Sequence, residues 1–396
     1  MTKSICTILW PLMIINYVFG LRIIAFPISH AKLCFNLLYI LLLWSIFCFL
    51  LIYTAMSYIV HYCLIYHICL RINVLIVFLT IVSTVQYKKK FRKCLNKLAM
   101  IDDTLENLGA TTDYRKLQRR VVWLVLGWCM MYISVIYGES SWFAEYYNLD
   151  TPTAVYITVI LNYCRFMNFI GDITIASILG YVELKFDQVN KYLQELLKNN
   201  KLEVKEERVW KNPTLYSTQQ TFPKTQYKEW MTWIVIHLHV ELREISHEIN
   251  SIFATQMTLK MLCFFGDITL GLREVFNLIL INNYINGSMM YIIMTLYILF
   301  LNVFRLFLIN WMCEKVCVKA KATGEIINTM TYSTSNTEVR KNISQLLLQI
   351  TYAPLRFCGL DLFQFGFKFL FKFSKTIATV LVILVQAHTE IVTKNL

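Results

Sequence analysis

Residues 353–390 read APLRFCGLDLFQFGFKFLFKFSKTIATVLVILVQAHTE. Taken as a helix with about 100° of rotation per residue, this stretch gathers its hydrophilic side chains into a sector about 60° wide. The members of this polar stripe are Lys368, Lys372, Lys375, Thr379, Gln386 and Glu390. The remaining surface is almost wholly Phe, Leu, Ile and Val. Such a pattern is typical of a transmembrane helix that turns one face to water or to polar partners.

The polar stripe extends to depths where lipid offers no hydrogen-bond partner. The apolar run after Lys375 covers about 12 residues, or about 18 Å. A crossing of about 30 Å therefore has to begin near Phe367, which places the lysines within the inner third of the membrane. In the alternative interpretation the lysines snorkel to the headgroups while Thr379 and Gln386 bond to neighbouring helices. Because Gln386 is too far along the helix to snorkel, the pattern favours a water-filled conduit.

The whole chain has the composition of a polytopic membrane protein. Its 396 residues are 57% hydrophobic and 15% aromatic, well above the content of soluble domains. A formal charge of +13 would suggest nucleic-acid binding in a soluble protein. Here the basic residues are confined to particular segments, so we interpret them as topology signals and expect no nucleic-acid partner. The 12 cysteines predict no disulfide framework.

Seven hydrophobic stretches are long enough to cross a bilayer as helices. They cover about residues 35–58, 68–86, 121–138, 154–180, 250–269, 290–311 and 366–388. The connecting segments alternate in charge, with 29 Lys and Arg in one set, 1–34, 87–120, 181–249 and 312–365. Only 2 lie in the other set, 59–67, 139–153, 270–289 and 389–396. The positive-inside rule then predicts a cytoplasmic N-terminus and an extracellular C-terminus, with the glycosylation sequon at Asn286 outside.

The sequence predicts an all-α fold with four parts. Residues 1–34 form a cytoplasmic or interfacial segment, because the apolar run from Ile5 to Phe19 is short for a span. Residues 35–311 hold helices 1 to 6, with cytoplasmic loops 87–120 and 181–249. Helical patterns from Tyr181 to Trp210 and from Lys228 to Asn250 predict long helices that continue below the membrane. With Glu338–Ile350 of an anchor segment, 312–365, they are expected to form a cytoplasmic bundle; the alternative is a solvated loop with loose helices. Residues 366–396 supply the last helix and a short extracellular tail.

The last helix also carries a family resemblance. Insect gustatory receptors end in a helix with Thr-Tyr, five hydrophobic residues and Gln-Phe. Thr379, Val380, Leu381–Val385, Gln386 and Ala387 match that spacing, with Val and Ala in place of Tyr and Phe. The run from Phe357 to Leu362 and the segment from Leu242 to Leu262 are similar to further parts of the family. The chain therefore resembles the insect gustatory receptors, relatives of the insect odorant receptors.

The resemblance implies a tastant-gated, non-selective cation channel in the plasma membrane of sensory neurons. It implies a homo- or hetero-tetramer that is anchored near the cytoplasm, contacts membrane lipids and binds a small-molecule tastant. The pore and gate would be formed by Thr379, Val382, Ile383 and Gln386, and the pore-facing stripe would include Lys368, Lys372 and Lys375. The tastant would bind in the outer halves of spans two to six, where the aromatic and polar candidates are Tyr132, Tyr156, Asn162, Tyr163, Arg165 and Tyr297.

Arg165 is the sharpest of the ligand-binding candidates, because a charge deep in the fourth span needs a partner. Asp172 lies two turns further along the same helix, which is too distant for a direct pair. The sequence leaves open whether an acid on another helix or a ligand meets this charge. Neutralising Arg165 is therefore expected to alter ligand potency.

Other classes of protein fit the sequence less well than a channel does. A G-protein-coupled receptor would need an outside N-terminus, a DRY-like triplet and an NPxxY motif, which the sequence lacks. A small-solute transporter would need internal repeats and helices broken by Gly or Pro, for which Gly171 and Gly266 are slight indications. We expect no enzyme, cofactor or metal site, since no nucleotide-binding or hydrolase motif is present. His237, His239 and His247 also lack the three- or four-residue spacing of metal ligands on a helix.

Overall fold

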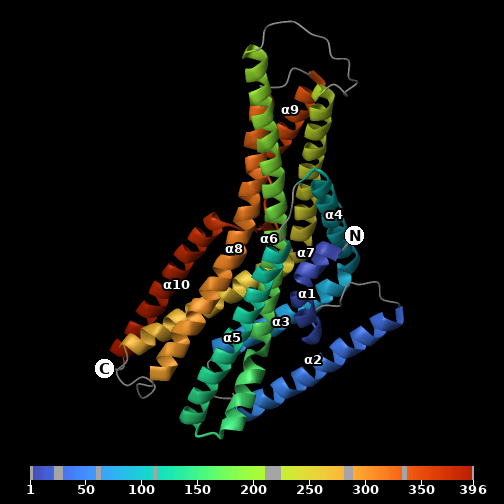
Figure 1. The fold of residues 1–396 in the computed structure, drawn as a ribbon. Coiled ribbons are helices and arrows are strands. Elements are labelled where there is room, and N and C mark those ends of the chain that lie inside the picture. The colour runs from blue at the N-terminus through green and yellow to red at the C-terminus, as the bar shows by residue number, and fades with distance from the viewer. Residues whose placement is uncertain are drawn as a thin grey trace.

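A computed structural model describes residues 3–21, 30–58, 64–109, 114–209, 224–280, 289–331 and 337–394. These residues are almost wholly helical, which confirms the predicted all-α fold (Figure 1). The first five helices are α1 (Lys3–Val18), α2 (His30–Tyr58), α3 (Leu64–Gln86), α4 (Lys88–Asn107) and α5 (Tyr114–Tyr147). They are followed by α6 (Thr151–Val209), α7 (Lys224–Leu280), α8 (Met289–Thr331), α9 (Thr337–Tyr352) and α10 (Phe367–Lys394). The glycosylation candidate Asn286 lies outside the described residues.

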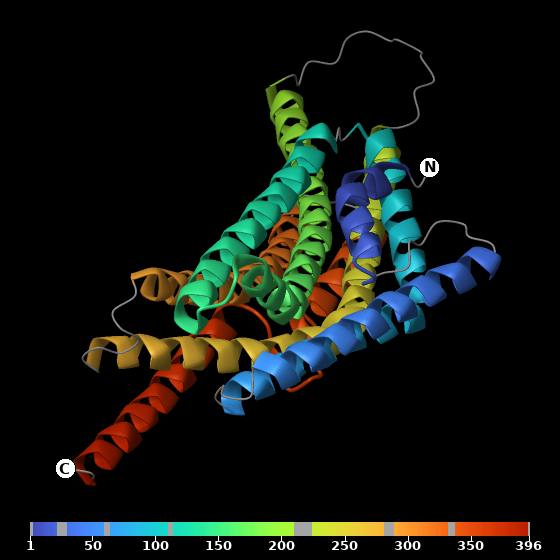
Figure 2. The ribbon, with the colours of Figure 1, turned by 90° about the horizontal axis from the view of Figure 1, so that it is seen from below.

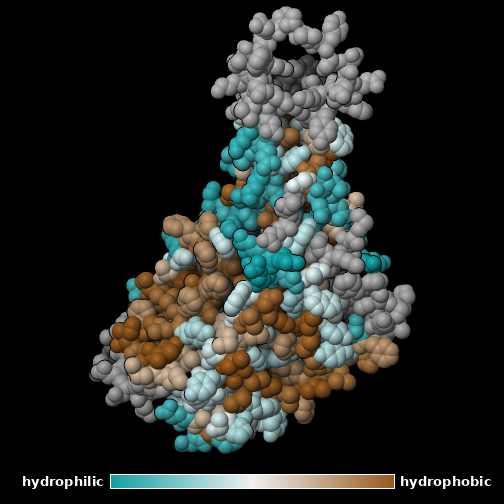
Figure 3. Space-filling view, in the orientation of Figure 1, coloured by the Kyte–Doolittle hydropathy of each residue, from teal (hydrophilic) through white to brown (hydrophobic). Residues whose placement is uncertain are grey.

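The described residues form a broad, mainly apolar part and a narrow, hydrophilic stalk. The stalk consists of the extended ends of α6, α7 and α8 together with α9 (Figure 1). Its visible surface is mainly hydrophilic, whereas large hydrophobic areas cover the broad part (Figure 3). Helices α6 and α7 are 59 and 57 residues long, so the predicted helical continuations of the fourth and fifth spans are present. Seen from below, α2 and α10 lie at the periphery, and α10 projects away from the other helices (Figure 2).

Each of the seven predicted spans lies within a helix, but their membrane character differs. Among the described residues, four helical stretches are long and apolar enough to cross a membrane: Phe35–Thr54, Tyr114–Tyr147, Met289–Thr329 and Phe367–Gln386. A fifth is possible if α3 and α4, which are bent by 69° at Tyr87, count as one broken span. The stretches in α6 and α7 contain buried polar side chains, among them Asn168, Asp172 and Lys260, which lower their apolar content. Seven membrane crossings therefore remain a prediction.

The first helix packs into the bundle through one face. Ile8, Leu9 and Leu12 are buried, and α1 contacts α5 and α6. The side chain of Asn16 is also buried and donates a hydrogen bond to Thr174 of α6 over 3.0 Å. The apolar run that is short for a span thus contributes to the core, while its placement at a membrane interface remains a prediction.

Helix α4 fills much of the predicted loop 87–120 and joins the stalk through a buried ion pair. The carboxylate of Asp102 meets the Lys185 ammonium of α6 and accepts a hydrogen bond from the Tyr181 hydroxyl. Both charged side chains are at most 2% exposed. Burial lowers the pKa of Lys185, although the Asp102 carboxylate opposes that shift. A polar network therefore fixes α4 against α6.

A short hairpin connects the stalk to the last helix. Its strands, β1 (Cys358–Gly359) and β2 (Phe363–Gln364), are antiparallel, with Cys358 opposite Gln364 and Gly359 opposite Phe363. The turn places Leu360 and Asp361 at positive φ of 48° and 58°. Helix α10 then begins at Phe367, as the hydrophobic length predicts.

Candidate functional site

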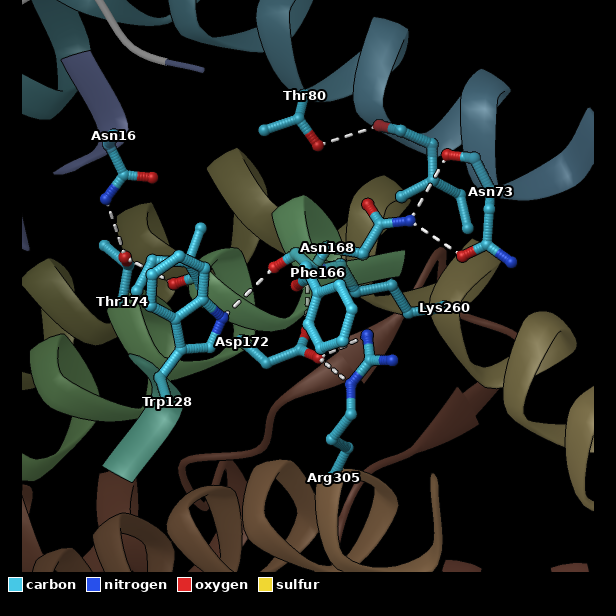
Figure 4. Close-up of polar contacts among 12 residues, drawn as sticks. Asn16, Asn73, Thr80, Trp128, Phe166, Asn168, Asp172, Thr174, Lys260 and Arg305 are labelled. Atoms are coloured by element: carbon cyan, nitrogen blue, oxygen red, sulfur yellow. Dashed lines mark hydrogen bonds and ion pairs between the residues drawn. The ribbon is translucent and has the colours of Figure 1, made fainter. Parts of the chain in front are cut away.

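Three charged side chains meet inside the helical bundle. Asp172 of α6 lies between Lys260 of α7 and Arg305 of α8 (Figure 4). The Lys260 Nζ atom is 2.5 Å from Asp172 Oδ1, and Arg305 Nε is 2.8 Å from Oδ2. All three side chains are at most 5% exposed. Lipid offers a charged side chain no partner, so a charge within an apolar helix faces the interior of the bundle. Here the three charges link α6, α7 and α8.

This charged triad holds two cations for one carboxylate. Lys260 donates a further hydrogen bond to the backbone carbonyl of Asn168 over 3.0 Å. The Arg305 guanidinium lies 5.2 Å from the ring centre of Phe169 and 4.9 Å from that of Phe264. One backbone carbonyl and two aromatic rings therefore stabilise the positive charge that Asp172 does not neutralise.

Buried amides extend the polar network toward the third helix. The Asn168 amide donates to Asn73 of α3, over 2.9 Å to the side-chain oxygen and 3.2 Å to the backbone carbonyl (Figure 4). Trp128 of α5 donates its ring N–H to the carbonyl of Phe166 over 3.4 Å. Because unpaired polar groups in this environment are costly, these bonds specify how α3 and α5 pack on α6.

Arg165 has an acidic partner that the sequence left open. Glu139 of α5 lies 3.9 Å from its guanidinium, and Asn162 accepts a hydrogen bond from it over 3.0 Å. Asn162 also donates to Glu139, so the three side chains form a closed group between α5 and α6. Glu139 was predicted to lie in an outer loop, but α5 continues to Tyr147 and carries it into the bundle.

The other predicted ligand-binding residues are distributed over several faces of the bundle. Tyr132 packs between Trp128 and Phe166, and Tyr297 shares a 3.0 Å hydrogen bond with Ser134. Tyr156 accepts a hydrogen bond from Thr54 of α2 over 3.2 Å. Tyr163 also faces α2, with ring contacts to the following residues: Trp44 and Phe47 of α2, and Phe19. The structure brings Asn162 and Arg165 together, whereas Tyr156 and Tyr163 lie on the side of α2.

A small cavity adjoins the Arg165 group. It is lined by residues of α5, α6 and α8, including Arg165, Asn302 and Arg305. Its volume is about 20 Å³, which suffices for one water molecule but is far below the 300–1,000 Å³ or so of a drug-sized pocket. In this conformation, the cavity brings two guanidinium groups and an amide to one point without room for an organic ligand.

The polar stripe of α10 lies opposite the face through which this helix packs. Phe373 and Ile377 are buried, and the ring of Phe373 contacts Phe265 of α7 at 5.8 Å. The described stripe residues are exposed: Lys368, Lys372, Lys375, Thr379 and Gln386. Val382 and Ile383, which flank the stripe, are 55% and 57% exposed. From Lys375 to Gln386, the helix thus presents its hydrophilic edge away from its own subunit.

Helix α8 holds the start of α10. Asn310 accepts a hydrogen bond from the Gly366 N–H over 3.0 Å, and Glu314 accepts one from the Phe367 N–H over 3.4 Å. The first N–H groups of a helix have no partner within it, and a carboxylate there also suits the helix dipole. Gly366 has a φ of 134°, which only glycine adopts readily. Two side chains of α8 therefore bind the backbone at the start of α10.

Sequence reasoning overlooked Glu139, Lys260 and Arg305. Lys260 and Arg305 each carry the same signal as Arg165, since they are single charges inside the apolar runs TLKML and VFRLF. Among the described residues, no group of three His, Cys, Asp or Glu side chains is arranged to hold a metal ion. His239 is instead buried against Phe186, and His237 stacks on Trp233.

These features define an all-helical, multi-pass membrane protein with a charged interior and an amphipathic last helix. The chain matches the family model described as 7tm Chemosensory receptor over residues 9–391. It therefore belongs to the seven-transmembrane chemosensory receptor family, which confirms the resemblance to insect gustatory and odorant receptors at the level of the family.

Solved structures support the same fold. The insect olfactory receptor OR5 from Machilis hrabei is similar, with a TM-score of 0.66 and 11% identity over 98% of this chain and 99% of that one. The same receptor in complex with eugenol has a TM-score of 0.65 and 11% identity over 97% and 98% of the two chains. A search of curated proteins by sequence found no match. At this identity the solved structures support the fold alone.

Proposed function

We propose that this protein is a gustatory receptor that works as a tastant-gated, non-selective cation channel in the plasma membrane of sensory neurons. The observation that carries the proposal is the orientation of α10, which buries Phe373 and Ile377 and leaves its polar stripe exposed. A helix of this kind can line a shared aqueous axis when several subunits assemble around it. Val382, Ile383 and Gln386 then form the constriction, with Thr379 one to two turns before them.

The proposed assembly is a tetramer, either of identical subunits or with related receptors. In Figure 1, α1 begins beside the base of the stalk, whereas α10 ends at the far side of the apolar part. This arrangement, together with the 29 basic residues on one set of segments against 2 on the other, supports a cytoplasmic stalk and an extracellular C-terminus. The stalk and the anchor segment 312–365 offer subunits a place to join outside the lipid.

The proposed ligand is a small-molecule tastant that binds near the Arg165 group. The solved relative in complex with eugenol supports small-molecule binding by this architecture. Because the cavity here holds only about 20 Å³, the tastant has to displace side chains between α5, α6 and α8. A ligand that binds the open arrangement better than the closed one shifts the gating equilibrium. Asn310 and Glu314 at the start of α10 provide a route from α8 to the pore helix.

Electrical recording with thiol modification tests this proposal. The receptor is expressed in oocytes with a tastant panel, and Gln386→Cys is exposed to a membrane-impermeant cationic thiol reagent. We expect the reagent to reduce the evoked cation current of Gln386→Cys, because the new thiol faces the pore. Ile377→Cys, on the buried face of the same helix, and the unmodified receptor serve as controls and are expected to change little.

Three outcomes would contradict the channel. If the reagent reduced the current of both cysteine variants equally, α10 would not line the pore. Currents that disappear with G-protein inhibition would favour a G-protein-coupled receptor, and tastant uptake without current would favour a transporter.

A further inference from the structure

A large cavity opens where α10 leaves the stalk. Its volume is about 1000 Å³, and its walls come from α7, α8, α9, the β1–β2 hairpin and the first turns of α10. It shares no lining residue with the small cavity beside Arg165. The cavity therefore represents a second, much larger space in the described part of the protein.

The wall of this cavity is strongly basic. Five cationic side chains line it: Arg243, Lys321, Arg356, Lys368 and Lys372. The lining contains two carboxylates, Glu314 and Glu325. The remaining titratable groups do not restore the balance, because His239 is buried and uncharged at neutral pH and Cys317 is a thiol whose pKa burial raises to about 12. The cavity thus has a clear surplus of positive charge.

Several of these cations are not used by the fold. Arg243 is held by the backbone carbonyls of Gln349 and Ala353, and Glu314 is engaged at the start of α10. The other four cations are exposed, and within the described ranges none forms an ion pair with an acid: Lys321, Arg356, Lys368 and Lys372. Like charges gathered around one space repel each other, so a polyanion in that space would be stabilising.

We propose that this cavity binds the polyphosphorylated headgroup of an anionic membrane lipid of the phosphoinositide class. Arginine and lysine are the side chains that bind phosphate. Several phosphate groups on one headgroup can contact the cations of α8 and α10 together with Arg356, which lies just before the hairpin. A cavity of about 1000 Å³ accommodates a sugar-sized headgroup with its phosphates.

The rim of the cavity favours a lipid over a soluble phosphate. Leu362 and Phe371 are each 76% exposed, and Phe367 is 47% exposed. Leu362 lines the cavity from the hairpin turn, and Phe367 and Phe371 are next to the lining residues Lys368 and Lys372 in the first turns of α10. Acyl chains can follow the helix from there into the bilayer while the headgroup stays in the cavity. The inference rests on the proposed cytoplasmic orientation of the stalk, since anionic lipids of this class belong to the cytoplasmic leaflet.

The bound headgroup has a consequence for the proposed channel. Lys368 and Lys372 belong to the polar stripe and would repel cations that pass beside them. Phosphate groups in the cavity neutralise these lysines and bridge α8 to α10. Lipid binding therefore lowers the electrostatic repulsion of cations in the pore, and depletion of the lipid reduces the evoked current.

A binding experiment tests the lipid site independently of channel activity. The full-length receptor is purified and reconstituted in phosphatidylcholine nanodiscs, and binding of a fluorescent phosphatidylinositol bisphosphate is measured. The triple variant Arg356→Gln, Lys368→Gln, Lys372→Gln is expected to weaken binding about 100-fold, since each basic residue contributes substantially to the free energy of binding to anionic lipid. The matched control changes exposed basic residues outside the cavity, Arg92→Gln, Lys93→Gln and Lys341→Gln, and is expected to bind nearly as the unmodified receptor does.

Competition distinguishes the source of the phosphates. Unlabelled phosphatidylinositol bisphosphate should compete at least tenfold better than inositol trisphosphate, and phosphatidylserine should compete poorly. Equal competition by inositol trisphosphate would overturn the lipid assignment. Equal loss in the two triple variants, or absence of binding to the assembled receptor because a neighbouring subunit fills the cavity, would overturn the site itself.

Folding and function are controlled separately. If the triple variant fails to elute as a folded assembly, the single variant Lys372→Gln replaces it, with Lys341→Gln as its control. Lipid binding that persists in a receptor without tastant-evoked current would support the site while contradicting the proposed channel.

Discussion

Arg305 of α8 forms an ion pair with Asp172 of α6 through Nε and a terminal nitrogen, each 2.8 Å from the same carboxylate oxygen. The two residues are separated by 133 positions in the sequence and lie fully inside the bundle. Lys260 of α7 approaches the other oxygen of the carboxylate. One acidic side chain therefore links three long helices.

Removing this carboxylate is expected to destabilise the protein strongly. Asp172→Asn leaves Lys260 and Arg305 buried without a negative partner, which costs about 3–5 kcal/mol. The double variant Asp172→Asn, Lys260→Met removes one of the stranded charges and should recover part of that loss. The measurement is the apparent melting temperature of the solubilised receptor. An unchanged melting temperature for Asp172→Asn would show that the triad does not hold the helices.

Neutralising Arg165 is expected to shift tastant potency rather than abolish expression. Arg165→Gln removes one guanidinium from the small cavity and keeps a hydrogen-bonding group beside Asn162 and Glu139. We expect the half-maximal concentration of an effective tastant to change about tenfold, as for loss of one charged contact. Lys191→Gln, on the stalk, is the control. An unchanged dose response at normal surface expression would place the ligand elsewhere.

The stability of the stalk is expected to fall in acid because of His239. Burial lowers the pKa of His239 from 6.5 to about 4. The unfolded chain therefore takes up this proton first as the pH falls. Stability from the neutral imidazole is complete above pH 6.5 and is lost progressively toward pH 4, up to about 3 kcal/mol.

Thermal unfolding between pH 7 and pH 4 measures this effect. His239→Gln should reduce the pH dependence in that range, because the replacement does not titrate. His237→Gln, which changes an exposed histidine that stacks on Trp233, is the matched control. If both variants keep the full acid sensitivity, other groups are responsible for it.

A methyl group at Gly366 is expected to disturb the start of the last helix. Gly366 has a φ of 134°, and a Cβ there would collide with the Glu314 carboxylate. Gly366→Ala should therefore cost about 1–3 kcal/mol and reduce the evoked current. In contrast, Gly127→Ala in α5 meets nothing within 4 Å and should be neutral or slightly stabilising. Comparison of melting temperatures and current amplitudes checks both expectations, and equal effects would contradict them.

The helices themselves could be predicted because their signals are local. The start of α10 near Phe367 follows from hydrophobic length, and the continuation of α6 beyond Tyr181 follows from helical periodicity. The partner of Arg165 could not be predicted in this way. Glu139 was assigned to a loop because the predicted span ended at residue 138, whereas α5 continues to Tyr147.

The sequence by itself determined the helical fold and the polar stripe of α10, since both depend on the order of polar and apolar residues along one segment. Only the tertiary structure decided which buried charges are partners. Asp172, Lys260 and Arg305 lie on three helices, and their meeting depends on the rotation and depth of each helix in the bundle. The same holds for the basic cavity, because Arg356, Lys321 and Lys372 line one space only when the segment before the hairpin, α8 and α10 pack together.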